Sequence, residues 1–183
     1  MTGSYQILPS LPEDITALVK LVNSAYRGNI SKKGWTTEAD LLDGTRTDAL
    51  ALASIFQSPS DTILKCCDTN NRIVACVHLQ QQDKKIYLQM LTVSPEMQTA
   101  GIGKKLLIAA EGYATDHACH TIVMTVISVR HELIEWYERR GFTRTGQTKP
   151  FPKDSRFGIP KQELEFILME KIITGIHSTA NNI

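Results

Sequence analysis

The chain has 183 residues, of which 42% are hydrophobic and 21% are charged, a composition that argues against a disordered protein and favours one folded domain. Its formal net charge is only +1, because 20 Lys and Arg residues face 19 Asp and Glu residues. That balance argues against nonspecific binding of nucleic acid and against attraction to an anionic membrane, so neither is expected as a partner.

The first third of the chain has helical periodicity after a short strand. Residues 5–8 form a short apolar segment that predicts a strand. Ser10 and Glu13 have the spacing of a capping box, and apolar residues at helical spacing follow as far as Tyr26. Two further helices are expected, each opened by a threonine: residues 38–43 after Thr37 and residues 48–57 after Thr47.

The middle of the chain changes to strand periodicity. Runs rich in β-branched and apolar residues are separated by polar turns, which predicts an antiparallel meander with strands at residues 62–67, 72–80 and 85–93. The later elements are expected to be a helix over 103–117, a strand over 121–127, a helix over 132–140, and strands over 142–145 and 162–171. This order predicts a single α+β domain over residues 1–173 and a flexible tail at 174–183.

Four cysteines lie inside strand-like, apolar stretches, at Cys66, Cys67, Cys76 and Cys119. A zinc site that combines the first three with His78 lacks the paired C-x-x-C spacing of such sites. Reduced thiols in the core are therefore the better interpretation, and no metal is expected. The N-terminus lacks the pattern of a secretory signal, and no apolar run approaches the roughly 20 residues that span a bilayer, so a cytoplasmic protein is expected.

The most informative stretch is residues 91–107, where a strand leads into a loop with two glycines and then into a long helix. The first turn of a helix has N–H groups without partners and a partial positive charge, so it suits a phosphate. Gly101 and Gly103 place no Cβ between the backbone and such an anion, and Lys104 and Lys105 add positive charge. These residues predict a phosphate-binding loop without identifying the phosphate.

Three phosphate-binding motifs compete for this loop. A Walker P-loop needs Ser or Thr where Lys105 stands, and a dinucleotide fingerprint needs Gly or Ala where Leu106 stands. The remaining pattern, Gln98-x-x-Gly101-x-Gly103, resembles the signature Q/R-x-x-G-x-G/A of the GNAT (GCN5-related N-acetyltransferase) family, and the preceding strand ends as usual there in Leu-x-Val-x-Pro. Downstream, residues 130–142 resemble the family motif N-x-x-A-x-x-x-Y-x-x-x-G-F. The chain is thus similar to a small member of that family over residues 62–171.

The resemblance implies a mixed central sheet of about seven strands flanked by helices, and a site for acetyl-CoA. Backbone groups of Leu91 and Val93 are expected to pair with the pantetheine arm, in a splay between residues 85–93 and 121–127. The following loop is expected to hold the pyrophosphate through its N–H groups. The residues that the resemblance assigns to the cofactor are Leu91, Thr92, Val93, Gln98, Thr99, Ala100, Gly101, Ile102, Gly103, Lys104 and Arg130.

Tyr137 matches the family's general-acid tyrosine. A phenol with a pKa of about 10 can give a proton to the departing CoA thiolate, whose thiol has a pKa of about 8.5. Two positions depart from the family pattern, because Arg130 stands where Asn is frequent and Thr99 stands where Gly is common. The general base stays open: the strand before the loop offers no carboxylate, and His78 and Glu165 are weak candidates.

The resulting prediction is an acetyl-CoA-dependent N-acetyltransferase that moves the acetyl group directly to a primary amine. The acceptor, a small molecule or a peptide, is expected to contact Tyr26, Trp35 and His78. One alternative is a noncatalytic acyl-CoA-binding module, which the missing strand carboxylate favours. The other is an enzyme that binds a nucleotide phosphate in the same loop. The resemblance leaves a homodimer open.

Overall fold

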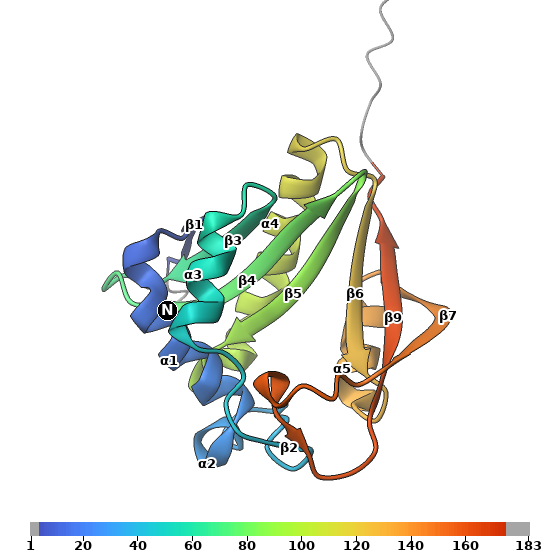
Figure 1. Ribbon diagram of the computed structural model, residues 1–183. Helices are drawn as coiled ribbons and strands as arrows, with labels where there is room; N and C mark the ends of the chain where they lie inside the picture. The colour runs from blue at the N-terminus through green and yellow to red at the C-terminus, as the bar shows by residue number, and fades with distance from the viewer. Residues whose placement is uncertain (1–3, 175–183) are drawn as a thin grey trace, which may run out of the picture.

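A seven-stranded sheet in the order β1-β3-β4-β5-β6-β9-β7 runs through the computed structural model, which describes residues 4–174 (Figure 1). The strands are β1 (Gln6–Pro9), β3 (Asp61–Cys67), β4 (Ile73–Gln82), β5 (Lys85–Val93), β6 (Thr121–Ile127), β7 (Thr143–Pro150) and β9 (Glu165–Ile172). A separate antiparallel pair joins β2 (Leu42–Asp43) to β8 (Ile159–Pro160). The mixed α+β architecture predicted for the chain is confirmed.

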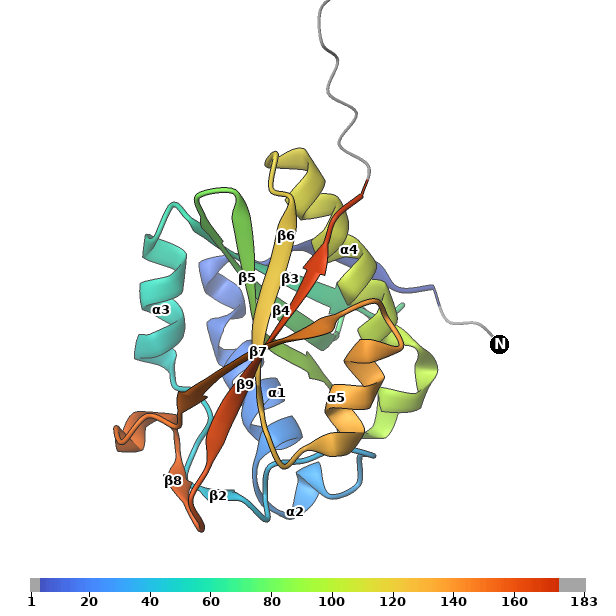
Figure 2. The ribbon, with the colours of Figure 1, turned by 90° about the vertical axis from the view of Figure 1, so that its right-hand side faces the viewer.

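Helices cover both faces of this sheet, as Figure 2 shows. They are α1 (Ile15–Tyr26), α2 (Gly28–Ser31), α3 (Ala49–Gln57), α4 (Ile102–Asp116) and α5 (His131–Glu138), with 3-10 turns at Pro12–Asp14, Pro95–Ala100 and Ser155–Phe157. α1 and α3 lie against one face, and α4 and α5 lie against the other. β3, β4 and β5 pair antiparallel as predicted, whereas β6 runs parallel to β5 because α4 carries the chain back between them.

Each face of the sheet has its own hydrophobic core. Successive side chains of a strand point to opposite faces, so neighbouring residues of β3 belong to different cores. Leu64 packs in the cluster that contains Leu106 of α4, whereas Ile63 packs in the cluster that contains Leu18 of α1. Burial of both faces explains why β3 and β4 are apolar along most of their length instead of alternating with polar residues.

The predicted capping box at Ser10 is wrong. The backbone N–H of Ser10 donates to the carbonyl of Ile63 at 2.7 Å, so this residue continues the edge pairing of β1 instead of opening a helix. Its hydroxyl is buried without a hydrogen-bond partner among the described residues. The turn before α1 is closed by Asp14 instead, whose carboxylate accepts from the N–H of Leu11 at 2.8 Å.

The helix predicted over residues 38–43 is also wrong, since this segment forms turns and then enters β2. The side chain of Glu38 is drawn inward by ion pairs with Arg27 and Arg130, and this tertiary contact overrides the local helical pattern. The next helix forms as α3, but its N-cap is Asp48 instead of Thr47, because the Asp48 carboxylate accepts from the N–H of Ala51 at 2.8 Å.

The strand predicted over residues 142–145 continues as β7 to Pro150. Its pairing with β9 shifts register between Arg144 and Thr148, around Gly146 at φ 81°. A bulge of this kind bends a strand without ending it. A glycine in the sequence does not reveal whether the strand ends there or continues through a bulge. The single-domain boundary at residue 173 stays a prediction, and the predicted tail lies outside the described residues beyond Thr174.

Candidate active site

β5 and β6 separate in the middle of the sheet, as Figure 1 shows. Their parallel pairing covers only Lys85–Tyr87 with Thr121–Val123. Beyond these pairs, residues 88–91 of β5 and 124–127 of β6 both line a cavity of about 220 Å³. A β-bulge accompanies the separation, because Met90 has φ 51° and the pairing with β4 shifts register nearby. The splay predicted between these two strands is therefore present.

The edge of β5 that faces the separation has no partner strand beyond Tyr87 within the described residues. The N–H of Ser94 donates to the carbonyl of Val74 on β4 at 2.8 Å. Since backbone groups alternate sides along a strand, Leu91 and Val93 direct their N–H and carbonyl groups toward the separation. An extended ligand placed in the separation could pair with these groups as an added strand does.

Side chains already bond to both carbonyls on this edge. The hydroxyl of Tyr26 donates to the Leu91 carbonyl at 2.8 Å, and the Gln98 amide donates to the Val93 carbonyl at 3.4 Å. Burial raises the pKa of Tyr26, so its phenol stays protonated and able to donate. The edge is thus fixed in place by one residue from α1 and one residue from the turn before α4.

The glycine loop has the geometry of a helix N-terminus with room in front of it. Gly101 adopts φ 74°, the left-handed conformation, and has nothing within 4 Å of the position that a Cβ would occupy. α4 begins at the next residue, so the N–H groups of its first turn have no intrahelical acceptors. Gly103 is packed instead, because a Cβ there would lie 3.3 Å from the Trp136 ring. The loop therefore offers N–H groups to an anion.

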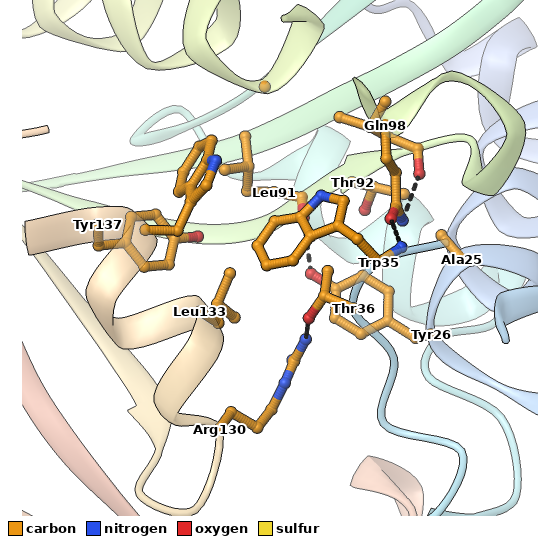
Figure 3. A pocket seen from close by; sticks show the side chains of 13 residues that line it. Ala25, Tyr26, Trp35, Thr36, Leu91, Thr92, Gln98, Arg130, Leu133 and Tyr137 are labelled. Atoms are coloured by element: carbon orange, nitrogen blue, oxygen red, sulfur yellow. Dashed lines mark hydrogen bonds between the residues drawn. The ribbon is translucent and has the colours of Figure 1, made fainter. Parts of the chain in front are cut away.

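Tyr137 lies where the loop, the splayed strands and α5 meet. Its side chain is 5% exposed and is held by edge-to-face contacts with Trp136 at 5.0 Å and Phe142 at 5.5 Å between ring centroids. Its hydroxyl forms no hydrogen bond with any described residue, and Figure 3 shows the oxygen pointing into the cavity. Burial raises the pKa of Tyr137 above its ordinary value, so the phenol is protonated throughout the neutral range.

A smaller cavity of about 80 Å³ adjoins the loop, and a segment from the N-terminal half borders it (Figure 3). The N–H of Trp35 donates to the Gln98 amide oxygen at 2.9 Å, and the Trp35 and Trp136 ring centroids lie 6.3 Å apart. The two cavities share five residues: Tyr26, Leu91, Arg130, Leu133 and Tyr137. Groups held in the two cavities would therefore meet beside the Tyr137 hydroxyl.

A buried ionic network forms part of the wall of the larger cavity. Glu38 accepts from Arg130 at 3.0 Å through one carboxylate oxygen and pairs with Arg27 through the other. Arg130 also donates to the hydroxyl of Thr36. Arg27, Glu38 and Arg130 are 8%, 7% and 6% exposed, so their charges are compensated mainly by one another.

The structure brings most predicted site residues together, with clear exceptions. Tyr26, Trp35, Thr92 and Arg130 line one or both cavities, but His78 lines neither. His78 is buried with its Nε2 atom 2.5 Å from Asp61, and burial lowers its pKa. Glu165, the other predicted base candidate, also lies outside both linings. The exposed residues of the glycine loop that line neither cavity are Thr99, Ala100, Gly101 and Lys104, while the Ile102 side chain lies in the core.

Three functional candidates are absent from the sequence prediction. Glu38 and Arg46 line the larger cavity, and Trp136 lines the smaller one. Nothing in local sequence marks Glu38, because its partners Arg27 and Arg130 lie 11 and 92 residues away. Trp136 does carry a signal, since it directly precedes the motif tyrosine.

All four cysteines are buried and unpaired, and burial raises the pKa of Cys76 to about 12. Within residues 4–174, no group of three or more His, Cys, Asp or Glu side chains could hold a metal ion. Over the same range, every helix falls short of the length and apolar character that crossing a bilayer requires.

Comparison with known proteins gives consistent findings. The model of the Acetyltransferase (GNAT) family matches residues 18–142. Human N-acetyltransferase 8B is 24% identical over 125 residues, which are 65% of this chain and 54% of that protein. Mycothiol acetyltransferase of Rhodococcus erythropolis is 25% identical over 140 residues, which are 73% of this chain and 44% of that protein. The chain thus spans about half the length of these curated relatives.

The fold is also found among solved structures. The crystal structure of the ribosomal-protein-S18-alanine N-acetyltransferase from Escherichia coli superposes with a TM-score of 0.72 and covers 98% of this chain and 100% of that one. The sequence identity is 16%, so this likeness concerns the fold alone.

Proposed function

Because the chain belongs to the GNAT acetyltransferase family, we propose that it transfers an acetyl group from acetyl-CoA to a primary amine. The observation that carries the proposal is the junction of the two cavities. There, the open edge of β5 at Leu91 lies beside the buried, protonated phenol of Tyr137. A thioester that lies along that edge and enters from the smaller cavity, beside the glycine loop, would meet an amine that enters from the larger cavity.

The residues present fit the cosubstrate. The N–H groups at the start of α4 suit its pyrophosphate, and the open space at Gly101 lets the backbone approach an anion closely. The Leu91 and Val93 N–H groups suit its amide-containing arm, which can bind as an added strand. When bound, acetyl-CoA supplies an activated acetyl thioester.

The proposed reaction needs one group of the protein, the acid Tyr137, to complete its proton transfers. The amine nitrogen forms a bond to the acetyl carbon, the C–S bond breaks, and the sulfur leaves with its electron pair. Tyr137 donates its proton to that sulfur, and the proton lost from the amine restores the phenol through solvent. Tyr26 acts as a positioning residue, because its hydrogen bond to Leu91 fixes the strand edge that orients the thioester.

A noncatalytic CoA-binding module is the second candidate, and one observation favours it. The larger cavity contains a single carboxylate among its described lining residues, that of Glu38, and guanidinium groups occupy both of its oxygens. No lining carboxylate is therefore placed to accept the amine proton directly. The nucleotide-phosphate alternative finds no support in the family match.

Two measurements on the purified protein test the proposal. Titration calorimetry with CoA, ATP and NAD should give heat of binding for CoA alone. Release of thiol from acetyl-CoA in the presence of an amine panel should then exceed the rate without amine. CoA binding without amine-dependent release would favour the noncatalytic module, and absence of CoA binding would remove both candidates.

A further inference from the structure

The larger cavity carries an excess of positive charge. Its charged lining residues are Arg27, Glu38, Arg46 and Arg130, three cations and one carboxylate. Glu38 is committed to Arg27 and Arg130, and Glu132 approaches Arg130 from outside the cavity at 3.7 Å. These carboxylates offset the charges of Arg27 and Arg130 but leave that of Arg46.

Among the three arginines that line the larger cavity, Arg46 has no carboxylate partner within the described residues. Its guanidinium carbon lies 5.4 Å from the centre of the Tyr26 ring, and its side chain forms no ion pair with any described residue. The exposed residues Arg72, Arg144 and Arg156 each lie within 2.7 Å of a carboxylate, whereas Arg140, which is partly buried like Arg46, also stacks on an aromatic ring without an ion pair to a described residue. Arg46 is partly buried, so an anionic group in the cavity would find in it a cation that no carboxylate of the described residues already pairs with.

Most of the uncharged lining is apolar, with Gln89 and Thr125 among the exceptions. Leu42, Phe151 and Phe166 line it together with apolar residues of β5 and β6, and its volume is about 220 Å³. The Phe151 and Phe166 ring centroids lie 5.2 Å apart, with the rings tilted by 31°, and the pair forms an apolar surface. A ligand that satisfies both features has a negatively charged group and a compact apolar side chain.

We propose that the amine acceptor is a small amino acid-like molecule whose carboxylate binds Arg46 and whose apolar side chain packs on Phe151 and Phe166. This inference rests on the proposed acetyl transfer and names its acceptor class. The amine would then point toward the cavity junction beside Tyr137, and polycationic amines would be repelled by the arginines.

Matched acceptor pairs test the proposal. Leucine and phenylalanine are compared with isoamylamine and phenethylamine, which lack only the carboxylate, and kcat/KM is measured by thiol release. The amino acids should react about tenfold faster or more, the value of one charge-assisted contact. Arg46→Gln should abolish that preference through a higher KM, Arg46→Lys should keep part of it, and Arg139→Gln, which removes an exposed charge on α5, should leave it unchanged.

Equal or faster reaction of the decarboxylated amines, or an unchanged preference in Arg46→Gln, would overturn this inference while leaving acetyl transfer intact. If the protein shows no CoA binding by calorimetry, the proposed function fails instead. In that case, and also if CoA binds without turnover, the rise in melting temperature with millimolar leucine decides whether the larger cavity binds a molecule of the proposed amino acid-like class. A rise that is lost in Arg46→Gln supports it, and no rise contradicts it.

Discussion

The hydroxyl of Tyr26 on α1 donates a hydrogen bond of 2.8 Å to the carbonyl of Leu91 on β5, across 65 residues of sequence. This bond joins the N-terminal helix to the strand edge at the junction of the two cavities (Figure 3). Because the same ring lies below Arg46, one side chain links the edge proposed for the cosubstrate with the cation proposed for the acceptor.

Tyr26→Phe should lower the free energy of unfolding by about 1 kcal/mol, because the Leu91 carbonyl loses its donor in a partly buried place. Urea denaturation followed by circular dichroism measures the change. Tyr87→Phe is the matched control, since the Tyr87 hydroxyl lies on β5 without a hydrogen bond to any described residue. Equal stabilities of the two variants would show that the Tyr26 bond contributes nothing.

Tyr137→Phe should lower kcat by about tenfold to a hundredfold, because the departing sulfur loses its proton donor. The dissociation constant for CoA should stay unchanged. Tyr113→Phe removes a phenol of α4 that bonds to Thr62 outside both cavities, and it should keep full activity. Since burial raises the pKa of Tyr137, wild-type kcat should not fall through Tyr137 ionisation below about pH 10. A fall in kcat near neutral pH that is absent in Tyr137→Phe would contradict this assignment.

Gly101→Ala should weaken CoA binding by about tenfold or more, because the new Cβ projects into the space in front of the loop. The left-handed backbone at this residue should also cost about 1–2 kcal/mol of stability. Gly146→Ala is matched in strain, with φ 81° and nothing within 4 Å of its Cβ position, but it lies on β7. Calorimetry should find normal CoA affinity in the control, and loss of affinity in both variants would attribute the effect to folding.

Glu38→Gln should lower the free energy of unfolding by about 3 kcal/mol, because two buried guanidinium groups lose the carboxylate that pairs with both of them. Glu135→Gln removes an exposed carboxylate that pairs with Arg139 at 3.8 Å and should change stability by under about 0.5 kcal/mol. Chemical denaturation of both variants gives the comparison. A small effect at Glu38 would mean that the network is not coupled to folding.

The stability of the protein should fall as the pH falls below about 6.5, the ordinary pKa of histidine. Burial lowers the pKa of His78 in the folded protein despite the nearby Asp61, so the unfolded chain binds a proton first. The contribution is therefore present above the unfolded pKa and is lost as the pH approaches the lowered folded value. Urea midpoints at about pH 7.5 and 5.5 should differ less in His78→Gln than in wild type. Equal differences would exclude His78 as the source.

The order of elements and the glycine loop were accessible from the sequence because both depend on neighbours in the chain. Strand and helix periods, turn residues and the run from Gln98 to Gly103 are local patterns, and the helix α4 begins where the pattern predicts. Local prediction failed at residues 38–43 and at Ser10. There, contacts with Arg130 and with Ile63 from distant parts of the chain determine the backbone.

The sequence by itself determined the fold class, the family motifs and the candidate acid Tyr137. Only the tertiary structure decided which charges share a cavity, since Arg27, Glu38, Arg46 and Arg130 meet through folding and not through spacing. The tertiary structure also places His78 outside the cavities, although His78 lies on β4, next to β5, whose residues line the larger cavity. The physical reason is range: helix and turn hydrogen bonds and side-chain periodicity involve residues close together in the chain, whereas charge compensation and burial depend on surfaces that only the folded chain brings together.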